Sequence, residues 1–183
     1  MFTRSWSTSE RQYEVAVERD VKVRMPDGVV LDGDIYRPES PGRFPVILGA
    51  HAYNKELQSP PLRPVGFTPM RGWMESGDST FFARRGYVHA VFNVRGTGKS
   101  TGYYQLLGPI EAQDICHLID WLAQQPWSSG KVGMNGVSYL AMCQWRAAQL
   151  NPPHLAAMIP WEGISDMYRE WSFHGGIPET HFS

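Results

Sequence analysis

Residues 131–141 read KVGMNGVSYLA, and they place a serine, Ser138, where a buried strand must turn sharply into a helix. A nucleophile elbow has this layout, because the turn is tight enough to require a small residue beside the serine, and Gly136 supplies one. The serine hydroxyl then projects above the sheet, and the helix N-terminus favours negative charge that develops there. The stretch therefore predicts an α/β fold in which Ser138 is the nucleophile.

The match to the pattern G-x-S-x-G is incomplete. Its fifth position is Leu140 rather than glycine, and the next small residue is Ala141. A serine at such a place can also serve only as the cap of the following helix, which is the commonest role of serine there. The strand before Ser138 and the helix after it favour the nucleophile over the cap.

Continuous apolar runs around this stretch predict strands that are buried on both faces, as in a parallel sheet. They cover residues 44–50, 87–94, 132–134 and 155–159. Upstream, residues 13–36 mostly alternate between apolar and polar, and the turn Pro26-Asp27-Gly28 divides them into an antiparallel hairpin. The link at residues 54–79 is long for a loop and can hold functional positions or a short helix.

Two segments show helical periodicity. The first repeats its apolar residues at i, i+3, i+4 and i+7, and we expect Asp114 on its polar side. The second follows Ser138 and ends at Asn151-Pro152-Pro153, because proline cannot continue a helix. Strands that alternate with helices imply a parallel sheet with right-handed crossovers and helices on both faces. The apolar positions are Ile115, Leu118, Ile119 and Leu122 in the first helix, and Ala141, Trp145 and Ala148 in the second.

Composition limits the classes of partner. The chain has 183 residues, 42% hydrophobic and 13% aromatic, which suits one domain. Its net charge of -1 gives no electrostatic field that would attract nucleic acid or an anionic membrane, so a small-molecule partner fits better.

Cys116 and Cys143 lie in apolar helical patterns and are expected to be reduced. Residues 1–11 lack a signal-peptide core and no run is long enough to span a membrane, so we expect a cytoplasmic protein. The oligomeric state is left open.

Four ordered motifs resemble the N-terminal part of the α/β-hydrolase family of cocaine esterase and X-prolyl dipeptidyl peptidases. The resemblance implies a mostly parallel α/β-hydrolase sheet with an antiparallel N-terminal meander, truncated so that residues 1–183 lack the cap and the C-terminal strands. It also implies cleavage of an ester or amide, because the family includes esterases, prolyl dipeptidyl peptidases and β-lactam acylases. The motifs are MPDGVVL at 25–31, DIYRP at 34–38, RGTGKSTG at 95–102 and GVSYLA at 136–141, which fits the family's G-x-S-Y-x-G/A elbow.

The resemblance also assigns the groups that bind the oxyanion. In the family these are the backbone N–H of the residue after the nucleophile, here Tyr139, and a tyrosine hydroxyl after the first parallel strand, here Tyr53. A donor in that loop would lie at the carboxyl edge of the sheet, where open α/β sheets bind ligands. Tyr53 can instead be a loop aromatic that covers the core. No metal or organic cofactor is implied.

The chain does not supply an obvious base. In α/β-hydrolases the order is Ser, Asp or Glu, then His, and the family's acid and histidine come after further strands. Downstream of Ser138, His154 falls near the amino end of a strand, whereas Asp166 falls at the carboxyl edge. The ending at residues 171–183 looks interrupted, which predicts a fragment. The other acidic and imidazole groups there are Glu162, Glu170, His174 and His181.

Three hypotheses follow. The first is a serine hydrolase that forms an acyl-enzyme on Ser138, with His174 or His181 as base if the chain acts alone. The second is a catalytically incomplete fragment or pseudoenzyme, because a serine hydroxyl without a base is a poor nucleophile. The third is nucleotide binding through Lys99. The phosphate-loop spacing argues against it, since Asn93 stands where the first glycine belongs, and we expect residues 95–102 to form a tight turn.

Overall fold

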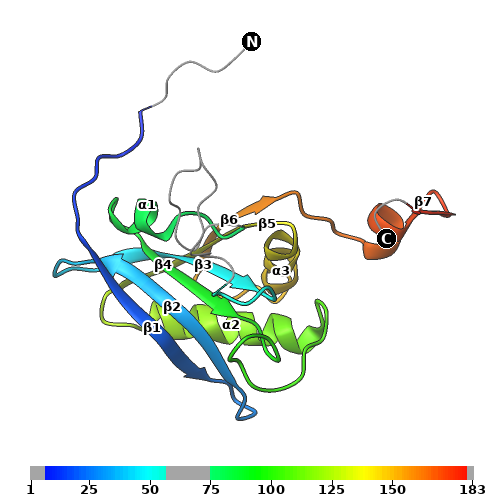
Figure 1. Cartoon of the computed structure of the whole chain (residues 1–183), viewed down its shortest axis with the longest axis horizontal. Helices are drawn as coiled ribbons and strands as arrows, with labels where there is room; N and C mark the ends of the chain where they lie inside the picture. Colours follow the sequence, from blue (N-terminus) through cyan, green and yellow to red (C-terminus); the bar gives the residue numbers. More distant parts are fainter. Residues whose placement is uncertain (1–6, 57–74, 181–183) are drawn as a thin grey trace.

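The computed structural model describes residues 7–56 and 75–180, and its N-terminal strands form the expected hairpin (Figure 1). Strand β1 (Val15–Arg24) pairs antiparallel with β2 (Val30–Pro38). The turn between them contains Gly28 at φ 90°, a conformation that glycine adopts without steric cost. The register shifts once in β1, between Glu18 and Val21, where Asp20 has φ 53°.

The buried apolar runs form the rest of a six-stranded sheet in the order β1-β2-β4-β3-β5-β6. Strand β4 (Val88–Asn93) pairs antiparallel with β2 and parallel with β3 (Phe44–His51). Strands β5 (Ser128–Val137) and β6 (Leu155–Trp161) continue in parallel. The carboxyl ends of β3 to β6 therefore lie along one edge. This confirms the predicted α/β class, a mostly parallel sheet preceded by an antiparallel meander.

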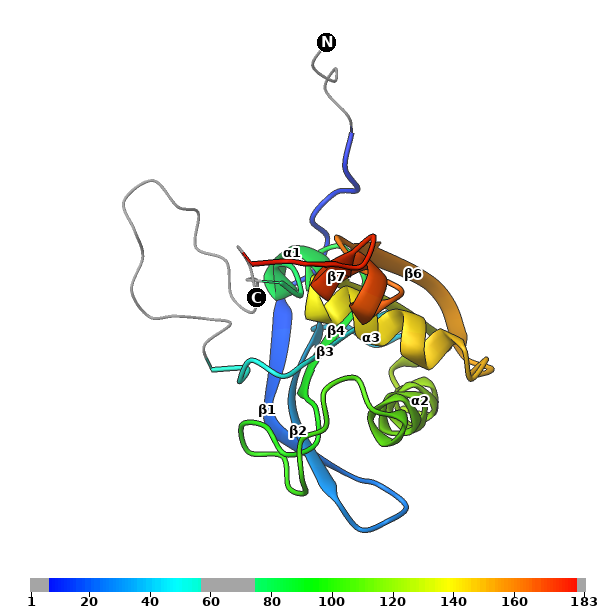
Figure 2. The ribbon, with the colours of Figure 1, turned by 90° about the vertical axis from the view of Figure 1, so that its right-hand side faces the viewer.

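Helices cover both faces of the sheet (Figure 2). Helices α2 (Pro109–Ala123) and α3 (Tyr139–Ala148) pack together on one face, and the short α1 (Ser79–Ala83) lies on the other. The apolar stripe predicted for α2 is confirmed. Its members, Ile115, Leu118, Ile119 and Leu122, are buried in the core.

Two expectations about the helices were wrong. In α3, Ala141 is buried as predicted, but Trp145 is 40% exposed and the buried side also includes Leu140, Cys143 and Ala147, so the apolar face is shifted from the predicted one. Asp114 is buried rather than on the polar side of α2. Its carboxylate accepts two hydrogen bonds from the Arg95 guanidinium, at 2.6 and 2.8 Å, and this partner compensates the buried charge.

Strand β6 was also expected to be buried on both faces, and it is not. Its side chains are intermediate or exposed, and Ile159 and Trp161 are each more than half exposed. Within the described part of the chain β6 pairs only with β5 and forms the edge of the sheet, so less of the core covers it.

After β6 the chain continues into one turn of π-helix, η1 (Met167–Ser172), and a small hairpin of β7 (Phe173–His174) and β8 (Ile177–Pro178), to one side of the sheet (Figure 1). Most of the long link at residues 54–79, and His181, fall outside the described residues. No helix among residues 7–56 and 75–180 has the length and apolar character that crossing a bilayer requires. Both cysteines are free, as predicted.

Candidate active site

Ser138 occupies a strained turn between β5 and α3. Its backbone has φ 57° and ψ -118°, a region that residues with a side chain rarely adopt. The Ser138 amide donates to Trp161 O at 3.0 Å, and the amides of Ala141 and Met142 donate to Ser138 O. The Ser138 side chain makes no capping hydrogen bond, so the alternative in which it is only a helix cap is wrong. These contacts hold the turn while leaving the hydroxyl uncommitted to the helix.

The small residues of the elbow have identifiable neighbours. A Cβ atom on Gly136 would lie 2.2 Å from the Leu140 Cβ atom, so nothing larger than glycine fits there. On the other side of α3, a Cβ atom on Gly163 would lie 3.0 Å from the Ala141 Cβ atom. Leucine is tolerated at position 140 because Gly136 lies beneath it, and position 141 is small because the chain after β6 passes close to it.

Tyr53 lies beside Ser138, on the loop that follows β3. Its ring meets the Tyr139 ring edge-on, with centroids 5.9 Å apart. Burial and the charge of Glu75 raise the pKa of Tyr53, and a polar interaction with the Ser138 side chain acts in the opposite direction, so the hydroxyl of Tyr53 faces Ser138. With 41% of its surface exposed, Tyr53 can reach a ligand. The structure thus brings together the three residues selected from the sequence.

The Tyr139 side chain points away from solvent, which the sequence did not indicate. Its hydroxyl donates to Glu111 Oε2 at 2.5 Å, and both residues are only 3% exposed. Burial raises the pKa of Glu111 to about 7, although the hydrogen bond from Tyr139 acts to lower it. Burial and the neighbouring Glu111 raise the pKa of the Tyr139 phenol, which is therefore a neutral donor.

Lys55, two residues after Tyr53, contacts a group of four carboxylates that sequence reasoning also missed, and two of them, Asp32 and Asp34, are buried. Its ammonium lies 2.8 Å from Asp20, 2.9 Å from Asp34, 3.3 Å from Glu56 and 3.5 Å from Asp32. Burial alone lowers the pKa of Lys55, but the hydrogen bonds to Asp20 and Asp34 outweigh it and raise that pKa. Carboxylates from β1 and β2 thereby hold the loop that carries Tyr53.

The same carboxylates could in principle ligate a cation. Oxygens of Asp20, Asp32 and Glu56 lie within 4.8 Å of one another. The Lys55 ammonium contacts all three residues and Lys99 contacts two of them, so lysine already supplies the positive charge at this place.

Lys99 belongs to the turn at residues 95–102, which is confirmed as a tight turn. The amide of Gly96 donates to Thr101 O at 2.9 Å, and Gly96 and Gly98 both have positive φ. A Cβ atom on Gly98 would lie 2.5 Å from Asn93 Nδ2. The glycines therefore serve close backbone packing, and Lys99 is committed to ion pairs.

Two histidines upstream of Ser138 are buried in the sheet, His51 at the carboxyl end of β3 and His89 near the amino end of β4. Burial lowers the pKa of His51 to about 4 and that of His89 to about 3, so both are neutral near pH 7. His89 Nδ1 lies 2.8 Å from Ser79 Oγ. Neither ring nitrogen of His51 has a hydrogen-bond partner among the residues that the structure describes.

The acidic and imidazole groups after Ser138 bond mostly to their own surroundings. His154 lies at the amino end of the sheet, as expected, with Nδ1 3.1 Å from Gly130 O. Asp166 caps η1 by accepting from the amides of Tyr168 and Arg169. His174 Nε2 lies 2.7 Å from Glu170 O. The structure therefore does not join His154, Asp166 or His174 to Ser138 in a proton relay.

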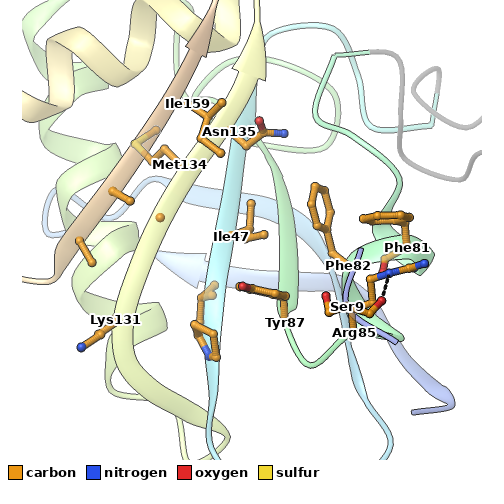
Figure 3. A pocket seen from close by; sticks show the side chains of 15 residues that line it. Ser9, Ile47, Phe81, Phe82, Arg85, Tyr87, Lys131, Met134, Asn135 and Ile159 are labelled. Atoms are coloured by element: carbon orange, nitrogen blue, oxygen red, sulfur yellow. Dashed lines mark hydrogen bonds between the residues drawn. The ribbon is translucent and has the colours of Figure 1, made fainter. Parts of the chain in front are cut away.

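The apolar pocket in Figure 3 is lined by Met134 and Asn135 of β5 but by no residue of the turn at 136–139. It has a volume of about 390 Å³, and Ile47, Phe81, Phe82 and Tyr87 point into it from β3, α1 and the start of β4. A second hollow, of about 720 Å³, lies between α3 and residues 164–168. Neither is lined by Ser138, Tyr53 or Tyr139.

Comparison with known proteins identifies relatives of the chain. It is 35% identical to the cocaine esterase of Rhodococcus sp. over 162 residues, which are 88% of this chain and 26% of that protein. It is 32% identical to the Xaa-Pro dipeptidyl-peptidase of Lacticaseibacillus rhamnosus over 108 residues, 49% of this chain and 14% of that protein. The chain thus spans about a quarter or less of the length of these relatives.

A solved structure and a family model also match hydrolases of this kind. The crystal structure of a CocE/NonD family hydrolase from Staphylococcus aureus superimposes with a TM-score of 0.77 at 45% identity, over 90% of this chain and 30% of that one. The model of the X-Pro dipeptidyl-peptidase (S15) family matches residues 27–183. The chain belongs to the X-Pro dipeptidyl-peptidase (S15) family of hydrolases.

Proposed function

We propose that the chain carries the nucleophile and the oxyanion-binding donors of a serine hydrolase that cleaves an ester or an amide. The observation that carries this proposal is the Ser138 backbone, which is strained at φ 57° and ψ -118° although its hydroxyl caps no helix. Strain of this kind persists where the surrounding structure enforces it, and it clusters at functional sites. The esterase and peptidase activities in the relatives' names support the substrate class.

The geometry fits acyl transfer. Ser138 Oγ attacks the carbonyl carbon and its proton passes to a base, while the electron pair of the C=O bond moves onto oxygen. The Tyr139 amide, at the first position of α3, has no acceptor within the helix and can donate to that oxyanion. The Tyr53 hydroxyl, whose pKa responds to the Ser138 side chain, is the second donor.

Collapse of this intermediate breaks the bond to the leaving alcohol or amine, which takes the proton from the base and leaves an acyl group on Ser138. Water then attacks the acyl-enzyme by the same steps and restores the serine. The proposed substrate is a small ester, amide or peptide. Neither nucleic acid nor a membrane is proposed as a partner. On this proposal the acid and the base of the relay are residues other than His154, Asp166 and His174, whose contacts do not include Ser138.

The alternative is a chain that is catalytically incomplete by itself. It is favoured by the contacts of Asp166, Glu170 and His174, whose hydrogen bonds stay within residues 165–174. Such a chain would keep the oxyanion donors, but its Ser138 hydroxyl would react slowly because no base takes its proton.

The test is labelling of the purified chain with a fluorophosphonate probe, with and without added imidazole as an external base. Ser138→Ala is the key variant and Ser165→Ala, an exposed serine after β6, is the matched control. Circular dichroism checks that each protein is folded.

Labelling that is lost only in Ser138→Ala supports the proposed nucleophile, and if it needs no imidazole the chain also supplies a base. Labelling that appears only with imidazole supports an intact nucleophile in a chain without its base. A folded chain that is not labelled under either condition would contradict the proposal.

A further inference from the structure

A buried carboxylate connects helix α2 to the residue that follows the nucleophile. Glu111 lies in the first turn of α2, and its side chain reaches Tyr139, the first residue of α3. The two residues are 28 positions apart in the chain, and Oε2 of Glu111 accepts the Tyr139 hydroxyl at 2.5 Å. A carboxyl group buried in this way is costly unless it is paired, so the contact fixes both side chains.

The Tyr139 ring is in turn the surface on which Tyr53 packs. The rings of Tyr53 and Tyr139 meet edge-on at 5.9 Å, and the centroid of the Tyr104 ring lies 6.5 Å from that of Tyr139. Burial raises the pKa of Tyr104, and the Tyr139 side chain also acts on that pKa by lowering it. Aromatic pairs in this geometry have a preferred orientation, so the position of the Tyr139 ring limits where Tyr53 can lie.

Both donors of the proposed oxyanion site therefore depend on Tyr139. Its amide is one donor, and the hydroxyl of Tyr53 is the other. Tyr53 is 41% exposed and lies on a loop. Packing of its ring on Tyr139 is therefore needed to keep the Tyr53 hydroxyl facing Ser138. Such preorganisation, rather than new contacts, is what makes an oxyanion site effective.

We propose that Glu111 is a positioning residue of the Ser138 site, which holds Tyr139 through its hydroxyl and thereby sets the place of the Tyr53 hydroxyl. This inference rests on the proposed function. Glu111 does not touch the reacting atoms; it acts through Tyr139.

The experiment reads the position of Tyr53 directly. The full 183-residue chain is prepared with 3-fluorotyrosine at position 53, and its ¹⁹F NMR signal is compared among variants. Glu111→Ala removes the acceptor, and Tyr139→Phe removes only the hydroxyl in case Glu111→Ala does not fold. Glu111→Gln keeps the shape of the side chain and one oxygen that can accept the Tyr139 hydroxyl. Asp114→Ala is the matched control, because Asp114 is a buried carboxylate on the same helix that pairs with Arg95 instead.

We expect the signal of residue 53 to move toward the position of a free tyrosine in Glu111→Ala and Tyr139→Phe, and to stay near the wild-type position in Glu111→Gln and Asp114→Ala. A signal that is the same in wild type, Glu111→Ala and Tyr139→Phe would overturn the inference. Equal movement in Glu111→Ala and Asp114→Ala would overturn it too, because it would show a general loss of structure.

Fluorophosphonate labelling of the same samples separates this inference from the proposed function. Where the wild type is labelled, Glu111→Ala should lower the labelling rate by roughly 10-fold or more, and Glu111→Gln should restore most of it. If the wild type is never labelled but the fluorine signal responds as expected, the proposed function fails and the positioning role stands. If labelling is intact and the fluorine signal does not respond, only the positioning role fails.

Discussion

The Nζ atom of Lys55 lies 2.9 Å from Asp34 Oδ1, and the two side chains are only 5% and 6% exposed. The pair joins the loop after β3 to the antiparallel strand β2. The backbone amide of Lys55 also donates to Asn93 Oδ1 at 2.8 Å, at the end of β4. The loop that carries Tyr53 is thus fixed by charge and by hydrogen bonding just beyond the tyrosine.

Lys55→Met should strongly destabilise the fold. It leaves the carboxylates of Asp32 and Asp34 buried with fewer positive partners, and breaking a buried pair in this way costs about 3–5 kcal/mol. Lys99→Met is the control, because Lys99 contacts the same cluster but is 53% exposed, and solvent screens a surface pair so that its loss should change stability much less. Urea unfolding followed by circular dichroism measures both. If Lys55→Met and Lys99→Met lowered the free energy of unfolding equally, burial of Lys55 would not be what makes its ion pairs important.

Gly136→Ala should destabilise the elbow by about 1–3 kcal/mol, because the new methyl group would overlap the Leu140 Cβ atom and force the start of α3 away from β5. Gly133→Ala on the same strand is the control. Its added Cβ would be 3.6 Å from the nearest atom, which is ordinary contact, so its stability should change little. Thermal unfolding distinguishes them, and a Gly136→Ala variant as stable as Gly133→Ala would show that the elbow tolerates a wider turn.

Ser138→Gly should be more stable than Ser138→Ala by about 1 kcal/mol, because glycine adopts the backbone of this turn without strain. At Ser165, which lacks a positive φ, the same pair of substitutions should show no such advantage for glycine. The free energy of unfolding of the four variants gives the comparison. An alanine variant at position 138 that matches the glycine variant would argue that the turn is unstrained.

The stability of the chain should depend on pH through Glu111. Burial raises the folded-state pKa of Glu111 from 4.5 to about 7, so the folded chain binds this proton more tightly than the unfolded chain. The contribution to stability is therefore complete below pH 4.5 and is lost as the pH rises through about 7. The groups that act on Glu111 are Tyr139, Asp114 and Arg146.

Glu111→Gln cannot titrate and provides the reference. The free energy of unfolding of the wild type, minus that of Glu111→Gln, should fall between pH 4.5 and about 8. His51 and His89 have lowered pKa values and stabilise the fold in the opposite direction, above their unfolded pKa, but they do so in both proteins and cancel in the difference. A difference that is flat across this range would show that Glu111 titrates normally.

The sequence was most informative where structure is local. The strand before Ser138, the small residues of the elbow and the stripe of Ile115, Leu118, Ile119 and Leu122 follow from periodicity and turn chemistry over a few neighbouring residues. The face of α3 was placed wrongly because apolar character alone selected Trp145. In the structure Gln144 is buried instead, since its side chain bonds to the backbone of Ile159 on β6.

The sequence by itself thus determined the class of the sheet and the place of Ser138 at the turn between β5 and α3, because both depend on residues that are close in the chain, whereas Tyr53 was selected through the resemblance to a family. Only the tertiary structure decided that Asp114 is buried with Arg95, that Lys55 closes the carboxylate cluster and that Glu111 holds Tyr139. The partners in these pairs are 19 to 35 positions apart. The energy of a buried charge or hydrogen bond depends on which group the fold brings opposite it, and no local pattern records that choice.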